Sequence, residues 1–304
     1  MRFLWATVAL LVLSFCEKDQ HGLASGAGLV VIDDLGQSVA LPAPAKRIAA
    51  LSPSNVEILW AIGCGSKIVL RDKISVFPAQ VQGVPATDVF RLSPEHVAGF
   101  RPDLILLSHQ DASRVAALRA IGLIVATFDP KTVEQVYRNI MAVGLLCGAP
   151  DKARSLITKM RERVQKVREQ VDKQPVPKVY VEIDGADPLK PWTVGSGSFV
   201  DQLIRMAGGQ NIAAGLNRPY AQISAEEVLS RQPDFVILTV GDDGRKLDEG
   251  KRALLRRPGW QALRAVREGR IIDNINAHLL TRPGPRLVEA LEALARALHP
   301  GASS

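Results

Sequence analysis

A stretch in the middle of the chain, residues 150–174, carries apolar side chains at steps of three and four, the spacing of one stripe along an α-helix. The stripe consists of Ala153, Leu156, Ile157, Met160, Val164, Val167 and Val171. Nearly all other positions are charged or polar, so only a narrow seam is expected to contact protein. Pro150 suits the start of a helix, and Pro175 prevents its continuation. The pattern predicts one long helix, either on an ordinary surface or as a connector between two lobes.

On both sides of this segment, short apolar runs alternate with segments of helical spacing. Ahead of it we expect a hairpin over residues 29–41, and strands over residues 47–51, 68–70, 103–107 and 123–128. Helices are expected after capping sequences at Ser54 and Ser93, and over residues 112–121 and 132–147. Beyond it we expect strands over residues 178–183, 234–240 and 270–275, and helices after Ser198, over residues 225–231, around residues 252 and 260, and over residues 285–298. The alternation predicts an α/β protein whose parallel sheets are covered on both faces.

The segments before and after the long helix are also related in sequence. Residues 92–107, LSPEHVAGFRPDLILL, align without a gap with residues 223–238, ISAEEVLSRQPDFVIL. A second pair, residues 52–65 and 196–209, agrees in residue type and keeps the same order. We therefore expect two α/β lobes with central parallel sheets joined by a single long rigid helix. The predicted limits are 27–148 for the N-terminal lobe, 149–175 for the bridging helix and 176–304 for the C-terminal lobe.

The composition is that of a soluble globular protein, with 47% hydrophobic and 23% charged residues among 304. The formal net charge of +7 raises the question of an anionic partner. Basic residues are dispersed and aromatic residues make up only 5%, which disfavours nucleic acid. A solvated basic surface or an anionic small ligand is the better interpretation.

The first 26 residues are typical of an export leader. Arg2 precedes an apolar run over residues 3–15, which is too short to span a bilayer and is followed at once by polar residues. Two fates remain open. Cys16 lies in a sequence similar to a bacterial lipoprotein cleavage box, although Phe15 departs from it, whereas Ala24 and Gly26 fit ordinary signal cleavage. The protein is expected to be periplasmic or otherwise exported, with a lipid on Cys16 at the outer face of the cytoplasmic membrane as the alternative.

No catalytic or metal-binding set emerges from the sequence. There is no G-x-S-x-G motif, no phosphate-binding glycine loop and no C-x-x-C pair, and the five histidines are scattered. Cys64 and Cys147 fit either one disulfide or two buried thiols. The sequence therefore predicts a protein that is not an enzyme and holds no resident metal or cofactor.

A cleft between two α/β lobes is a common place for a ligand, because the carboxyl ends of parallel strands open into it. The side chains expected there are Phe77, Phe90, His109, Trp192, Tyr220, Asp242, His278 and Arg282. Trp192 and Tyr220 lie in otherwise polar sequence, where they either stack on a flat ligand or plug the base of a loop. Arginines at positions 218, 282 and 286 either neutralise an anionic ligand or are simply solvated.

Glu95 and Glu226 occupy equivalent positions in the two repeats, each in the first turn of its expected helix. A carboxylate at this position is stabilised by the helix dipole, and this stabilisation is sufficient to explain both glutamates. The alternative is that one exposed charge on each lobe docks onto arginines of a two-fold symmetric partner.

These segments resemble the iron-chelate/vitamin B12 class of ABC-transporter substrate-binding proteins. The resemblance covers residues 30–300 and rests on residues 33–69, 92–107, 192–213, 223–238 and 281–300. It implies two lobes bridged by a rigid helix, and delivery of a bulky metal chelate to a transmembrane permease dimer with its ATPase. It also implies that Glu95 and Glu226 form salt bridges with permease arginines.

The resemblance leaves the chelate open between a corrinoid such as cobalamin and a ferric siderophore. The loop of residues 74–82 resembles that of B12 binders, but Val76 and Ala79 replace an acid and a second proline. His278 and Leu279 stand where those relatives tend to have an acid and an aromatic. Haem ranks third, because Asp88 and Phe90 stand where a haem binder often has an axial tyrosine. A periplasmic metallochaperone or enzyme on the same scaffold is the remaining alternative.

Overall fold

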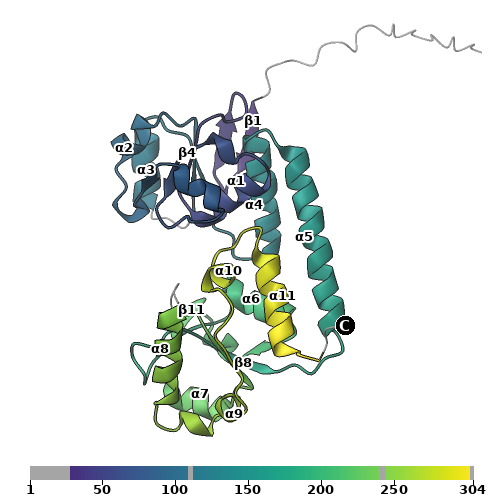
Figure 1. The fold of residues 1–304 in the computed structure, drawn as a ribbon. Helices are drawn as coiled ribbons and strands as arrows, with labels where there is room; N and C mark the ends of the chain where they lie inside the picture. The colour runs from purple at the N-terminus through teal and green to yellow at the C-terminus, as the bar shows by residue number, and fades with distance from the viewer. Residues whose placement is uncertain (1–27, 109–111, 240–243, 302–304) are drawn as a thin grey trace, which may run out of the picture.

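The computed structural model describes residues 28–108, 112–239 and 244–301, and it contains two lobes, each with its own sheet (Figure 1). A single helix, α5 (Pro150–Val171), runs along one side of the molecule past both lobes. The predicted fold class, two α/β lobes with central parallel sheets joined by one long helix, is confirmed. The expected leader, including Cys16, lies outside the described residues, as do His109 and Asp242.

The bridging helix packs through the predicted stripe. Ala153, Met160, Val164 and Val167 are buried, against α4 (Val133–Leu146) and α11 (Leu287–Leu298). Helices α4 and α5 approach closely, because a Cβ at Gly144 would clash with the Cβ of Ala153. Arg163 Nε and Nη2 each donate to Glu292 at 2.8 Å, which ties α5 to α11 by a bidentate ion pair. The helix therefore contacts elements of both lobes.

The N-terminal lobe has a five-stranded parallel sheet in the order β5 (Ala86–Thr87), β4 (Ile68–Asp72), β3 (Ile48–Ala50), β6 (Leu104–Leu107), β7 (Val125–Thr127). Helices α1 (Pro53–Ala61), α2 (Pro94–Gly99), α3 (Ala112–Ala120) and α4 lie between the strands in sequence, and β1 (Leu29–Ile32) with β2 (Ser38–Leu41) forms the expected hairpin. Short 3₁₀ helices occur at Gly65–Lys67, Ala79–Gly83 and Val89–Arg91.

The predicted N-cap of α1 is wrong by two residues. Ser52, not Ser54, is the N-cap, and its hydroxyl accepts from Asn55 N at 3.3 Å. Pro53 explains the difference, because its fixed φ and missing N–H suit the first helical position and place the cap on the residue before it. Ser54 is a buried residue inside the helix.

The C-terminal lobe has a sheet in the order β11 (Tyr220–Gln222), β9 (Trp192–Val194), β8 (Lys178–Asp184), β12 (Phe235–Leu238), β13 (Ile271–Ile272), with β10 (Gln210–Asn211) also paired to β8. Its helices are α6 (Phe199–Met206), α7 (Ala225–Arg231), α8 (Gly244–Leu255), α9 (Arg264–Arg267), α10 (Ala277–Thr281) and α11, with 3₁₀ turns at Ala214–Leu216 and Trp260–Ala262. Strands β9 and β11 pair antiparallel, whereas Trp192 and Tyr220 were expected in loops.

Two smaller sequence questions are answered by the described residues. Cys64 and Cys147 are free thiols, both buried, and burial raises the pKa of the Cys147 thiol. No helix within residues 28–108, 112–239 or 244–301 is both long and apolar enough to cross a bilayer.

Candidate functional site

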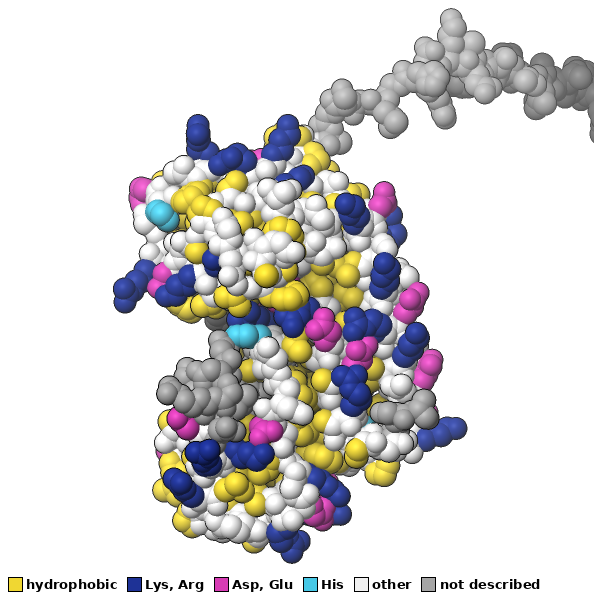
Figure 2. All heavy atoms as spheres, in the orientation of Figure 1, with side chains coloured by type: hydrophobic (Ala, Val, Ile, Leu, Met, Phe, Trp, Pro, Cys, Tyr) yellow, Lys and Arg dark blue, Asp and Glu magenta, His cyan; other side chains and the backbone are white. Residues whose placement is uncertain are grey.

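The face shown in Figure 2 is hollowed between the two lobes. At this hollow the loop that follows β4 meets the segment around α10 and the start of α11. Arg282 Nη2 donates to the carbonyl of Ile74 at 3.4 Å, and the guanidinium carbon of Arg286 lies 4.0 Å from the centre of the Phe77 ring. The two lobes therefore contact each other through side chains of the C-terminal lobe and the β4 loop.

A cavity of about 260 Å³ lies at this contact and is formed by both lobes. It is lined by Glu57, Trp60, Ala61, Phe77, Pro78, Gln80, Pro285 and Arg286. Arg286 Nη1 lies 3.9 Å from Glu57 Oε1, and Arg286 Nε donates to Glu289 Oε2 at 3.4 Å. Trp60 Nε1 is buried without a hydrogen-bond partner among the described residues. The interface thus brings one buried carboxyl, one arginine and two aromatic rings around the same cavity.

Glu57 is only 5% exposed, and such burial is unusual for a residue with a carboxyl group. Burial raises its pKa from an ordinary value of 4.5 to about 7, although the positive charges of Arg286 and Arg282 oppose the rise. The folded protein therefore binds this proton more tightly than the unfolded chain does. The resulting stabilisation, about 3 kcal/mol, is complete below pH 4.5 and is lost as the pH rises through about 7.

The loop after β4 carries further charged groups. Burial raises the pKa of Asp72, which ends β4. Lys73 Nζ donates to Asp88 Oδ2 at 2.8 Å, and this hydrogen bond lowers the pKa of Asp88. Asp88 also accepts from Phe90 N at 3.0 Å and so caps the 3₁₀ turn that presents Phe90, whose side chain is 80% exposed.

The predicted residues His278 and Arg282 belong to one turn of α10. Arg282 Nη2 lies 3.3 Å from His278 Nε2, and Asn276 caps the helix by accepting from His278 N at 2.8 Å. This short helix was not predicted. Its position explains why Arg282 meets the β4 loop, with His278 beside it.

The predicted aromatic pair lies on β9 and β11, the two neighbouring strands at one edge of the C-terminal sheet. Trp192 pairs with Gln222 and Val194 with Tyr220, so the alternation of side chains puts Trp192 and Tyr220 on the same face, offset by one diagonal step. Both remain exposed, at 42% and 52%. Because neither ring is buried in its own lobe, the geometry disfavours the loop-plug interpretation.

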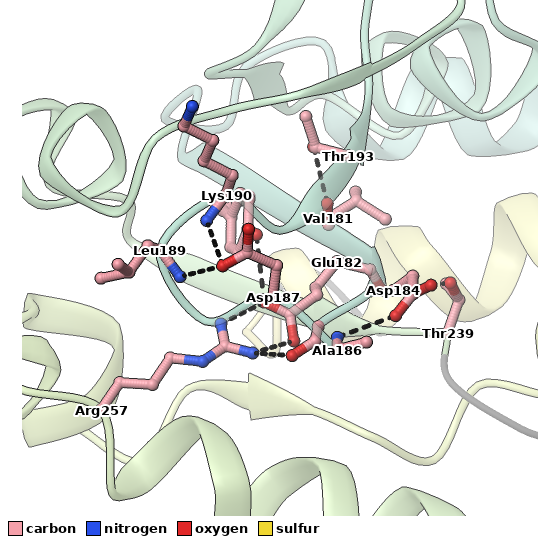
Figure 3. Close-up of polar contacts among 12 residues, drawn as sticks. Val181, Glu182, Asp184, Ala186, Asp187, Leu189, Lys190, Thr193, Thr239 and Arg257 are labelled. Carbon is pink, nitrogen blue, oxygen red and sulfur yellow. Dashed lines mark hydrogen bonds and ion pairs between the residues drawn. The ribbon is translucent and has the colours of Figure 1, made fainter.

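A buried ion pair anchors the loop that leads to Trp192 (Figure 3). Arg257 Nη1 and Nη2 donate to the two carboxyl oxygens of Glu182 at 2.6 and 2.9 Å, and Nη2 also donates to Gly185 O at 3.3 Å. Tyr180 Oη donates to the same carboxylate at 3.1 Å, and the Arg257 guanidinium lies 4.7 Å from the Trp260 ring. A Cβ at Gly185 would clash with both charged groups, so glycine is required there.

The same loop is ordered by its own aspartates. Asp184 Oδ1 accepts from Ala186 N at 2.8 Å, and Asp187 Oδ1 accepts from Leu189 N at 2.9 Å. Thr193 Oγ1 donates to Val181 O at 2.7 Å, which fixes β9 against β8. Together with Arg257, these contacts fix the path of the chain up to Trp192.

Glu95 and Glu226 lie in the first turns of α2 and α7, as predicted. Ser93 and Ser224 are the N-caps of these helices and accept from the main-chain N–H groups of His96 and Glu227. Both glutamates are exposed. Ser93 Oγ donates to Glu95 Oε2 at 2.7 Å and lowers the pKa of Glu95. Glu226 makes no hydrogen bond or ion pair within the described part of the chain, whereas its neighbour Glu227 pairs with Arg231.

The structure thus brings Phe77, His278 and Arg282 to one place between the lobes, and Trp192 and Tyr220 to one strand pair. Among the residues that the structure describes, no contact joins Phe90 to the other lobe. Sequence reasoning missed Glu57 as part of the site. The sequence did contain a signal: Glu57 is the one charged residue of α1 and stands between the apolar residues Val56 and Ile58. Carboxyl groups are rarely buried among apolar residues unless they have a partner or a functional role.

Within residues 28–108, 112–239 and 244–301, no three His, Cys, Asp or Glu side chains gather as a metal site. The cleft of this chain offers aromatic rings, arginines and carboxyls rather than a set of metal ligands. Such groups are suited to an organic or chelated ligand with charged substituents.

Known proteins are similar to this chain in sequence and in architecture. The family model described as periplasmic binding protein matches residues 48–274. An uncharacterised ABC transporter substrate-binding lipoprotein of Bacillus subtilis is 30% identical over 281 residues, which are 89% of this chain and 86% of the relative.

Solved structures agree with the sequence relatives. The periplasmic vitamin B12 binding protein of Vibrio cholerae superimposes with a TM-score of 0.73 at 26% identity, covering 86% of this chain and 99% of that one. An ABC-type Fe³⁺-hydroxamate transport protein of Saccharomonospora viridis gives 0.74 at 25% identity, with 89% and 99% covered. A periplasmic heme-binding protein of Roseiflexus gives 0.75 at 27% identity, with 85% and 100% covered.

Proposed function

The chain belongs to the periplasmic binding protein family, and from this premise we propose that it is the exported substrate-binding component of an ABC importer that carries a bulky metal chelate in the cleft between its lobes. The observation that carries the proposal is the hollow between two α/β lobes bridged by α5, with the exposed rings of Phe77 on one lobe and Trp192 and Tyr220 on the other. Exposed aromatic rings are costly to leave in water and suit a large flat ligand.

For the ligand we propose a corrinoid or a ferric siderophore. Similarity to proteins named for vitamin B12 and for Fe³⁺-hydroxamate supports both classes. Arg282 and His278 at the contact between the lobes favour a chelate with anionic or hydrogen-bonding substituents. Haem remains the alternative, supported by similarity to a heme-binding structure, although this chain has Phe90 where an axial tyrosine is expected.

For delivery we propose that Glu95 and Glu226 dock on a transmembrane permease dimer that works with an ATPase. Their matched positions on α2 and α7, and the exposure of both carboxylates, support this role. We also propose that the protein is held at the outer face of the cytoplasmic membrane by a lipid on Cys16, by analogy with the lipoprotein of Bacillus subtilis.

The test of the binding function is a titration of the purified mature protein, followed by tryptophan fluorescence, with cyanocobalamin, a ferric hydroxamate, a ferric catecholate and haem. We expect saturable quenching at one site by a corrinoid or a ferric siderophore, because the proposal assigns the exposed ring of Trp192 to the wall of the cleft. Binding of haem alone would replace the proposed ligand class. The absence of binding by all four compounds would contradict the carrier function.

A further inference from the structure

Arg286, the residue before α11, extends from the C-terminal lobe into the N-terminal lobe. Its guanidinium carbon lies 4.0 Å from the centre of the Phe77 ring, and its Nη1 lies 3.9 Å from Glu57 Oε1. On its own helix, its Nε donates to Glu289 Oε2 at 3.4 Å. Two of its three partners therefore belong to the other lobe, and the side chain is only 21% exposed.

Resting on the proposed carrier function, we propose that Arg286 is a positioning residue of the cleft, which holds Phe77 and the opposite lobe in the geometry that binds the chelate while Glu57 is ionised. A separation of 3.9 Å is too long for a well-formed hydrogen bond, so the contact with Glu57 depends on charge. The contact with Phe77 also depends on the orientation of the guanidinium over the ring. Losing the charge on Glu57 leaves Arg286 with Glu289, the one charged partner among the three, which lies on its own lobe and competes with the contact to Phe77.

Glu57 is the residue of this contact whose charge changes with pH. Its pKa is raised to about 7 by burial, so its charge changes close to neutral pH. Arg286 and Arg282 act on its carboxyl from the C-terminal lobe and lower the pKa, whereas Glu289 raises it. Within the described part of the chain, the elements that pack on α1 from its own lobe (the 3₁₀ turn Gly65–Lys67, β3, β4 and α4) add no charged group to that set. Lys67 of the 3₁₀ turn donates instead to the carbonyls of Ala45 and Cys147. The negative charge that attracts Arg286 across the contact between the lobes therefore forms as the pH rises through about 7.

The test is the affinity for cyanocobalamin and for a neutral ferric trihydroxamate, measured by calorimetry between about pH 5 and about pH 8. We expect the affinity of the wild-type protein to rise about tenfold over this range, a typical size for coupled sites. Glu57→Gln should give a flat profile at the low-pH value. Arg286→Gln should also flatten the profile, since it removes the positive charge that faces Glu57.

Two features make the result specific. His278 contacts Arg282 at the same place and is retained in Glu57→Gln, so a slope that survives in that variant would assign the effect to a group other than Glu57 and overturn the proposal. Glu292→Gln is the matched control, because it removes an ion pair of the same helix α11 with α5, away from Arg286. Its pH profile should equal that of the wild-type protein.

A second measurement needs no ligand and separates this inference from the carrier function. Carbon-13 NMR of the labelled glutamate carboxyls should show Glu57 titrating near pH 7, with a higher midpoint in Arg286→Gln because a neighbouring positive charge has been removed. A midpoint that does not move would overturn the role of Arg286, even if chelates bind. A shifted midpoint with no binding of any chelate would instead contradict the carrier function alone.

Discussion

Replacement of Glu95 and Glu226 together by alanine is expected to abolish uptake of the chelate by cells and to leave its affinity for the purified protein unchanged. Both carboxylates are exposed at the starts of α2 and α7, one on each lobe. Neither belongs to the contact between the lobes. Their removal therefore takes away two charges that a permease can recognise without altering the cleft.

The comparison is transport of a labelled chelate in a strain that lacks the natural protein, beside calorimetry on the purified variants. Glu227→Ala is the matched control, since Glu227 stands next to Glu226 in α7 but is already paired with Arg231 of its own helix. We expect normal uptake for the control, partial loss for each single variant and loss to background for the double variant. Wild-type uptake in the double variant would contradict the docking role.

Arg257→Met is expected to cause the largest loss of stability, about 3–5 kcal/mol in the free energy of unfolding at neutral pH. The substitution leaves the Glu182 carboxylate, 1% exposed, without the guanidinium that supplies two of its hydrogen bonds. Removing a single partner from a buried pair exposes the other charge to the full penalty of desolvation.

Denaturant unfolding followed by circular dichroism measures this effect. The double variant Glu182→Gln/Arg257→Met should recover most of the stability, because both charges are gone. Arg154→Met serves as the control, since its ion pair with Asp151 is fully on the surface, and its midpoint should not change. Equal losses in the Arg257 single variant and the double variant would show that the ion pair is not what stabilises this loop.

The long helix and the buried central strands were accessible from the sequence because they depend on local patterns. The stripe from Ala153 to Val171 has one period throughout, and the runs at β6 and β12 are apolar over their whole length. The start of α1 was misplaced because Ser52 and Ser54 both suit a cap, and only the backbone restriction imposed by Pro53 distinguishes them.

The candidate site was harder to predict because it is assembled by contacts distant in sequence. Trp192 and Tyr220 stand in short segments with turn residues nearby, so nothing local indicates that they pair as β9 and β11. Glu57 and Arg286 are separated by most of the chain, and their contact exists only once the lobes pack. A sequence pattern identifies the residue types of a cleft, whereas the partners across it come from the fold.

The central claim is that one chelate is held between both lobes, and calorimetric titration of one variant from each wall tests it most directly. Phe77→Ala and Trp192→Ala should each weaken the binding of the chelate identified in the fluorescence panel by roughly tenfold or more, with one ligand bound per chain. Unchanged affinity in both variants, or a loss in only one of them, would contradict a site shared by the two lobes.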